Sequence, residues 1–161
     1  MKLQLKTGAL LPALLVGAMS ITDLISSSQQ SYAKELPPQA TYQAMLDYGK
    51  KQGWIALKNN GNEQFIYFSH LQTLHCRLKE IRYSINTTEL DKRFNLVKCV
   101  KALPYSLPSN SKISDILVRV PLGTAQTVAV QVVWEDGRES EIAIYKPCEG
   151  VGDRVCAELV E

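Results

Sequence analysis

The sequence lacks the short motifs that mark the commonest catalytic and nucleotide-binding sites. It contains no G-x-S-x-G nucleophile elbow and no H-E-x-x-H zinc motif, and its nine glycines never form a G-x-G-x-x-G or G-x-x-x-x-G-K phosphate loop. These absences argue against the enzymes that these motifs define. We therefore expect a protein that is not an enzyme and that needs no cofactor.

A strong excess of charge of one sign is also missing. The chain has 18 Lys and Arg against 16 Asp and Glu, and the basic residues alternate with acidic ones. Proteins that bind nucleic acids or anionic membrane surfaces carry a basic patch or stripe. The charge pattern therefore gives no reason to expect nucleic acid or a membrane surface as a partner.

Histidine is rare, and both copies, His70 and His75, fall within SHLQTLHC at residues 69–76. Five positions apart, they point to opposite faces of a strand and lie about 140° apart around a helix. Cys76 would share a strand face with His70, but at a distance of roughly 20 Å between Cα atoms. Only a tight loop could gather these side chains around a metal ion. We therefore expect no metal ligands here.

Only one long apolar run occurs, at Gly8–Met19, after a positively charged start. It is shorter than the roughly 20 apolar residues of a membrane span. The small residues of SYA at 31–33 then occupy the positions that precede a signal-peptidase cut. We expect residues 1–33 to be a cleaved signal peptide, with earlier cuts or retention as an anchor still open. Residues 34–161 would form a single exported domain with no membrane span.

Four cysteines lie in that exported part: Cys76, Cys99, Cys148 and Cys156. An even number of cysteines in an exported chain indicates disulfides and an oxidising compartment, so we expect a periplasmic or secreted protein. Zinc modules bring cysteines two to four residues apart, whereas seven residues separate the closest two here. A zinc site made of all four cysteines stays a minor alternative.

Four cysteines allow three disulfide pairings, and the sequence alone does not choose among them. We favour Cys76–Cys99, which brackets two strand-like stretches that a loop through NTTELDK would bring together. We also favour Cys148–Cys156, which closes a short ring around EGVGD. Its two glycines give the backbone freedom to turn.

The first part of the exported chain predicts a helix and a hairpin. Tyr42, Met45 and Leu46 recur at helical spacing after Thr41, a competent N-cap, so we expect a helix at about 41–52. Strand-like stretches on either side of NNGN then predict a hairpin at about 54–68. Its turn is expected at Asn60-Gly61, because both residues tolerate positive φ.

Residues 69–85 support two interpretations. Apolar residues three and four apart fit a helix, and Ser69 with Gln72 fits a capping box at its start. Ile81, Tyr83 and Ile85, however, alternate with polar residues as in a half-buried strand. We favour a turn of helix or irregular chain at 69–75 and a strand at about 79–86.

The last part of the chain alternates most clearly. Val128, Val130, Val132 and Trp134 share one strand face before a turn at Asp136-Gly137, and a second strand follows. Because the opposite face of this strand is also apolar, we expect the strand to be central in its sheet and Trp134 to lie in the core.

From about 76 to 147, the stretches IRYSIN, DILVRVP and VAVQVVWEDGRESEIAIY resemble the strands of immunoglobulin- and fibronectin-III-like modules of exported bacterial proteins. The resemblance implies a small antiparallel β-sandwich. The immunoglobulin framework has a tryptophan between its two cysteines, whereas none lies between Cys76 and Cys99. Such modules share no functional residues, so the resemblance assigns none.

We therefore predict a mainly β (α+β) protein: an antiparallel β-sandwich with a short N-terminal helix and hairpin and a disulfide-closed tail at 148–161. The predicted function is that of a non-enzymatic binding module of the cell envelope, with a protein or envelope component as its partner. A periplasmic inhibitor or immunity protein against a hydrolase or toxin is one alternative, and an enzyme with an unrecognised site is another. The oligomeric state stays open.

Two local motifs have plain structural interpretations. Asn86-Thr-Thr would be a glycosylation acceptor in a eukaryotic secretory route, but we favour a polar turn at a strand end. Glu139 and Glu141 are two residues apart, which would put them on the same face of a strand. We expect a solvent-facing strand edge and not the acid pair of a glycosidase.

Overall fold

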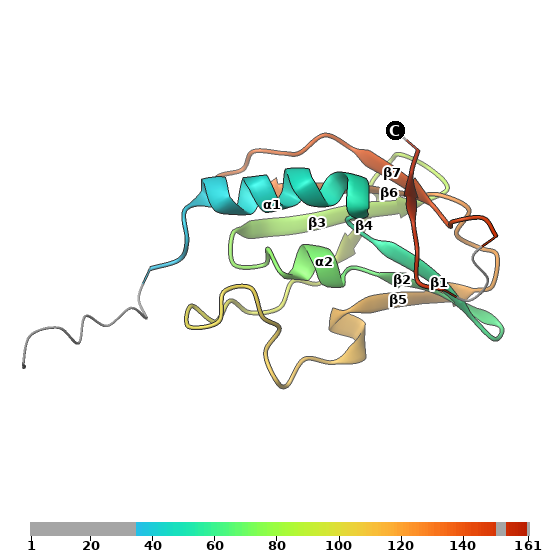
Figure 1. Ribbon diagram of the computed structural model, residues 1–161, viewed down its shortest axis with the longest axis horizontal. Coiled ribbons are helices and arrows are strands. Elements are labelled where there is room, and N and C mark those ends of the chain that lie inside the picture. The colour runs from blue at the N-terminus through green and yellow to red at the C-terminus, as the bar shows by residue number, and fades with distance from the viewer. Residues whose placement is uncertain (1–34, 151–153, 161) are drawn as a thin grey trace, which may run out of the picture. The chain divides into compact units, whose positions relative to one another are not determined.

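Two antiparallel sheets and a few short helices make up the fold (Figure 1). The computed structural model describes residues 35–150 and 154–160, so the expected signal peptide at 1–33 lies outside the described residues. The smaller sheet has the strand order β1 (Ala56–Asn60), β2 (Glu63–Tyr67), β5 (Leu117–Pro121). The larger sheet has the order β4 (Lys92–Phe94), β3 (Leu78–Ile85), β6 (Val128–Trp134), β7 (Ala143–Lys146), β8 (Glu158–Leu159). The prediction of a mainly β fold with two antiparallel sheets is confirmed.

Helix α1 (Gln39–Gln52) precedes the sheets, as predicted, but it begins two residues earlier than expected. Pro38 takes the N-cap position, and the backbone N–H of Thr41 donates to the Pro38 carbonyl at 3.0 Å. The expectation that Thr41 is the N-cap is therefore wrong. Pro38 has no side-chain acceptor, so its contribution to the start of the helix is its fixed φ and its carbonyl. The helix ends at Gly53, whose φ of 104° few other residues would adopt.

The predicted hairpin is present as β1 and β2, with its turn one residue later than expected. Asn60 pairs with Glu63, so the two loop residues are Gly61 and Asn62. Of these two, only Gly61 has positive φ, at 61°. The turn needs one left-handed residue at its first loop position, and the register of the strands assigns that position to glycine.

The strand predicted at about 79–86 is confirmed, because β3 spans Leu78–Ile85. Helix α2 (Ser69–Gln72) is a single turn, and β3 follows and pairs with β6 along its length. Phe68 takes the N-cap position of α2 and no side chain caps it. The capping box that Ser69 and Gln72 would have formed is therefore absent, and Gln72 uses its side chain elsewhere.

Strand β6 lies at the centre of the larger sheet, between β3 and β7, and all seven of its residues are buried. On its inner face, Val132 pairs with Ile81 and Val130 with Tyr83, so the valine row meets a second apolar row. The hairpin to β7 turns at Gly137, whose φ is 86°. The prediction that this strand is central is confirmed, since both of its faces are covered.

Two elements pack against the inner face of the larger sheet. From α1, the carbonyl of Leu46 accepts a hydrogen bond from Trp54 Nε1 at 2.8 Å, and the carbonyl of Lys50 accepts one from the Tyr145 hydroxyl at 2.9 Å. Burial raises the pKa of Tyr145 to about 12. From the end of β2, the ring of Phe68 contacts Tyr83 of β3. The core is therefore shared by the helix and both sheets.

The C-terminal tail connects the two sheets. The backbones of Cys156 and Leu57 of β1 exchange two hydrogen bonds, at 3.1 and 2.9 Å. Two residues later, β8 pairs with β7 of the larger sheet. The disulfide between Cys148 and Cys156 fastens this tail to the chain just after β7.

Both disulfides have the expected pairing, Cys76–Cys99 and Cys148–Cys156. They indicate an oxidising, extracytoplasmic environment. Within residues 35–150 and 154–160, no helix has the length and apolarity needed to cross a bilayer.

Asn86 occupies the polar turn predicted at the end of β3. Its φ is 60°, and its side-chain Oδ1 accepts from the backbone N–H groups of Gln126 and Thr127 at 2.9 and 3.0 Å. Its Nδ2 donates to the Thr124 carbonyl at 2.8 Å. The amide of Asn86 therefore holds the connection between β5 and β6 in place.

The position of Trp134 gives a test of the core. Its side chain is 1% exposed, so Trp134→Ala removes a large buried group, and we expect a loss of about 3–5 kcal/mol in the free energy of unfolding. Tyr48→Ala is the control, because Tyr48 is 76% exposed and its loss should change stability by less than about 0.5 kcal/mol. Denaturant unfolding measures both. A loss below roughly 1 kcal/mol for Trp134→Ala would contradict its place in the core.

Candidate functional site

The two histidines have different surroundings. His70, on α2, packs over Gly49 of α1 so closely that a Cβ at position 49 would lie 2.4 Å from its Nε2. Burial lowers the pKa of His70 below its ordinary value, because the protein interior disfavours the charged imidazolium. The glycine in the last turn of α1 is therefore explained by the close approach of the imidazole ring.

His75 lies in the turn between α2 and β3 and is 4% exposed. Its Nδ1 is 2.5 Å from the Gln72 carbonyl oxygen, and its Nε2 is 3.5 Å from Cys76 Sγ. One ligand atom from each of His75, Cys76 and Cys99 lies within 4.8 Å of the others. The tight turn brings His75, and not His70, to the two cysteines. In this form the two sulfurs are bonded to each other.

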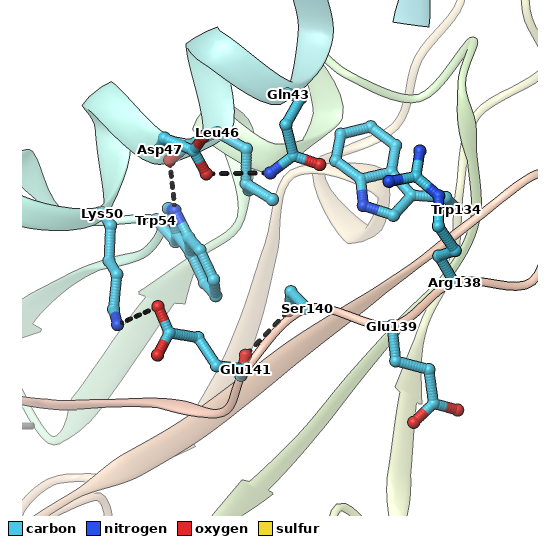
Figure 2. A pocket seen from close by; sticks show the side chains of 10 residues that line it. All are labelled: Gln43, Leu46, Asp47, Lys50, Trp54, Trp134, Arg138, Glu139, Ser140 and Glu141. Carbon is cyan, nitrogen blue, oxygen red and sulfur yellow. Dashed lines mark hydrogen bonds and ion pairs between the residues drawn. The ribbon is translucent and has the colours of Figure 1, made fainter. Parts of the chain in front are cut away.

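Glu139 and Glu141 point in different directions, as Figure 2 shows. The Glu139 carboxylate binds Arg82 at 2.7 Å, whereas the Glu141 carboxylate binds Lys50 of α1 at 2.6 Å. The two carboxylates therefore have separate basic partners and do not face a common substrate position.

Glu141 lines a cleft between α1 and the chain that follows β6 (Figure 2). The cleft has a volume of about 470 Å³ and includes both tryptophans, Trp54 and Trp134, in its lining. Both indoles are at most 2% exposed, and the Lys50–Glu141 ion pair joins the helix to the opposite wall. We interpret the cleft as a gap between packed elements, in which a ligand would find little exposed aromatic surface.

The segment at residues 95–116, between β4 and β5, is a long connection that we call the anchored loop. In Figure 1 it is drawn in yellow to orange and passes beside α2. Its regular structure is limited to the 3-10 turn η2 (Ile113–Asp115) and to tight turns such as Ser106 N–H to Leu103 O at 3.1 Å. Loops longer than about 12–15 residues are uncommon and usually functional or disordered.

The buried carboxamide of Gln72 fastens both ends of the anchored loop. Its Nε2 donates to the Asn95 carbonyl at 2.7 Å and to the Asp115 carbonyl at 2.8 Å. Its Oε1 accepts from the Val97 N–H at 3.4 Å. Gln72 is 0% exposed, so the two ends of the loop meet at a point that water does not reach.

Three further contacts hold the anchored loop. The Cys76–Cys99 disulfide ties its first part to the turn before β3. The ring of Tyr105 lies 5.1 Å, centroid to centroid, from the ring of Tyr42 on α1. At the far end, the Phe68 N–H donates to the Ile116 carbonyl at 2.8 Å. The loop is therefore fixed to the body of the protein at its start, middle and end.

The outer part of the anchored loop exposes apolar and basic side chains. Val100, Leu103 and Ile113 are 39%, 60% and 55% exposed. A hollow of about 320 Å³ lies within the loop, and the exposed Lys98 and Lys112 line it together with Leu96, Val97 and Pro108 among others. This combination suits a partner with apolar and acidic groups.

Sequence analysis did not identify the anchored loop as a site. One signal was present: the strand-like RFNLV and DILVRVP are separated by 17 residues, 98–114, which include two prolines and Cys99. The role of Gln72 had no such signal, since a glutamine three residues after a serine also fits a capping box.

Comparisons of the chain with protein-family models, with curated proteins and with solved structures find no match.

The hydrogen bonds of Gln72 predict that this side chain controls the order of the anchored loop. Gln72→Ala leaves two carbonyls without their donor and should cost about 2–3 kcal/mol of unfolding free energy. Trypsin cleavage at Lys98, Lys101 and Lys112 should become faster under native conditions. Gln64→Ala is the matched control, because Gln64 is a buried glutamine that fastens a different loop at Ala125. Equal protection of the anchored loop in both variants would refute the prediction.

The lowered pKa of His70 predicts a specific pH dependence of stability. The folded protein binds a proton at His70 less readily than the unfolded chain, so its contribution is present above about pH 6.5. That contribution is lost as the pH falls through the lowered pKa of the folded state. Urea unfolding at pH 5.5 and 7.5 should show a gain toward pH 7.5 that is smaller in His70→Gln. An identical pH dependence in both proteins would contradict it.

Proposed function

We propose that this protein is a non-enzymatic binding module of the cell envelope and that the anchored loop is its contact surface for a protein partner. The observation that carries this proposal is the loop itself, which exposes apolar side chains although both of its ends are fixed. A loop that needed only to connect β4 to β5 would not require a buried carboxamide and a disulfide at its base.

The fixed base supports binding for an energetic reason. Ordering a mobile loop upon association costs free energy for each immobilised residue and side chain. In this protein the loop is already ordered before a partner binds. It is held by the Gln72 hydrogen bonds, the Cys76–Cys99 disulfide and the Tyr42–Tyr105 ring contact. The exposed Leu103 and Ile113 are then available as anchors for a partner.

The charges of the loop indicate the chemistry of the partner. Lys98, Lys101 and Lys112 are exposed, and among the described residues none of them forms an ion pair. Asp115 instead accepts hydrogen bonds from Asn95 and from the Lys112 backbone. The partner is accordingly a protein surface that combines apolar side chains with carboxylates.

The likeness to immunoglobulin- and fibronectin-III-like modules belongs to this proposal. The two antiparallel sheets support it at the level of architecture. It favours a binding role, because such modules commonly present loops from a rigid scaffold. No residue role is taken from it.

An inhibitor of a hydrolase is the second candidate, and the same loop favours it. Leu103 is 60% exposed, is followed by Pro104 and lies on a loop that is fixed near both ends. A rigid exposed loop can enter the binding site of a hydrolase at a low cost in entropy. The identity of the partner separates this candidate from the general module.

The proposal predicts that substitutions in the anchored loop abolish capture of the partner. The experiment is an affinity pull-down from envelope extract, with mass spectrometry of the bound proteins, using the unsubstituted protein and Leu103→Glu/Ile113→Glu. Binding to the identified partner should weaken at least about tenfold in the double variant, since two apolar anchors become acidic. Leu122→Glu is the matched control, because Leu122 is 50% exposed but lies outside the loop.

The outcomes distinguish the candidates. Recovery of envelope components with the unsubstituted protein and with Leu122→Glu, but not with the loop variant, supports the module. A single hydrolase or toxin bound at one to one, with loss of its activity, supports the inhibitor. A partner that binds the loop variant and the unsubstituted protein equally well refutes the loop as the contact surface.

A further inference from the structure

The imidazole of His75 is held in one tautomer and directed at the Cys76–Cys99 pair. A carbonyl oxygen only accepts hydrogen bonds, so the 2.5 Å contact with the Gln72 carbonyl places the proton of the neutral ring on Nδ1. Nε2 then carries a free lone pair, and its neighbour at 3.5 Å is Cys76 Sγ. The side chain is 4% exposed, so water does not readily take the place of this neighbour.

This arrangement is the one that a histidine ligand of a metal ion adopts. Such histidines donate their other ring N–H to a carboxylate or a backbone carbonyl, which fixes the orientation of the ring. His75 Nε2, Cys76 Sγ and Cys99 Sγ lie within 4.8 Å of one another. Donors held at roughly 2.0–2.3 Å from one ion lie about 3.5–4 Å apart. The 3.5 Å between His75 Nε2 and Cys76 Sγ already matches this spacing, whereas the two sulfurs, which are bonded to each other, must separate. The disulfide is the feature that prevents the two sulfurs from acting as ligands.

We propose that reduction of the Cys76–Cys99 disulfide creates a three-coordinate site for Cu(I), formed by His75 Nε2 and the two cysteine sulfurs. Thiolate and imidazole ligands suit soft ions such as Cu(I), and a nitrogen and two sulfurs supply the low coordination number that Cu(I) accepts. A structural zinc site would need a fourth ligand. Among the described residues, no fourth His, Cys, Asp or Glu joins this cluster.

The chemistry balances with a dithiol as reductant. The dithiol gives two electrons and two protons to the Cys76–Cys99 disulfide and itself becomes a disulfide, leaving two thiols on the protein. Binding of Cu(I) then releases the two thiol protons to solvent as two Cu–S bonds and one Cu–N bond form. The ion thereby takes over the cross-link between the anchored loop, which carries Cys99, and the turn before β3.

The test measures Cu(I) affinity by competition with a chromogenic chelator under anaerobic conditions. A phosphine reductant opens the disulfides, becomes phosphine oxide at the expense of water, and is removed before copper is added. Because it also opens Cys148–Cys156, the protein used is the Cys148→Ser/Cys156→Ser variant, and the same variant with Cys76→Ser measures the background. We expect one Cu(I) per chain after reduction and no stoichiometric copper or zinc in the oxidised protein.

His75→Gln, made in the same variant, should weaken Cu(I) binding at least tenfold, whereas the matched His70→Gln should leave it unchanged. Near-UV circular dichroism follows the fold in each case. If the reduced chain unfolds without copper, Cu(I) should restore the native spectrum with His70→Gln but not with His75→Gln. Equal affinity in the two histidine variants, binding no tighter than with Cys76→Ser, or a spectrum that copper does not restore would each overturn the proposal.

Discussion

A carboxamide that is fully buried must find all of its hydrogen-bond partners inside the protein, and Gln72 finds them on the anchored loop. This single requirement brings the start and the end of a long segment to one point beside α2. The disulfide then joins Cys99 of the loop to Cys76, and the backbone carbonyl of Gln72 separately contacts His75 Nδ1 within the turn. Gln72 therefore orders the loop through its side chain and orients the imidazole ring of His75 through its backbone carbonyl.

The turn at residues 69–77 both packs in the core and holds the anchored loop. Its apolar side chains, Leu71 and Leu74, are fully buried in the core, so the turn cannot move away from the sheets. Its polar groups hold the loop by hydrogen bonds and by a disulfide. The two kinds of contact differ in what breaks them, since hydrogen bonds respond to denaturant and the disulfide responds to reductant. Reduction would remove the Cys76–Cys99 contact and leave the Gln72 hydrogen bonds to the loop in place.

The sequence predicted those elements that depend on residues close together in the chain. The alternation of valines in β6, the Asn60-Gly61 signal and the spacing of the cysteines all led to features that the structure contains. The predicted start of α1 was wrong because the helix begins directly after Pro38, with no side-chain cap, and Thr41 lies within its first turn. The partners of Gln72 and the bridge between Leu57 and Cys156 could not be predicted, since backbone groups far apart in sequence leave no trace in side-chain patterns. The candidate site depends on such contacts, so it emerged only with the structure.

The tail that joins β1 to β7 has a consequence for how the chain acquires its fold. The first strand of the smaller sheet pairs with residues close to the end of the described chain, and β8 completes the larger sheet. Contacts of such long sequence separation form slowly, because a long loop must close before they contribute. During synthesis from the N-terminal end, the larger sheet therefore lacks β8, and β1 lacks its bridge to Cys156, until the tail has been made. The bridge from β1 to Cys156 and the pairing of β8 with β7 are therefore expected among the last contacts to form.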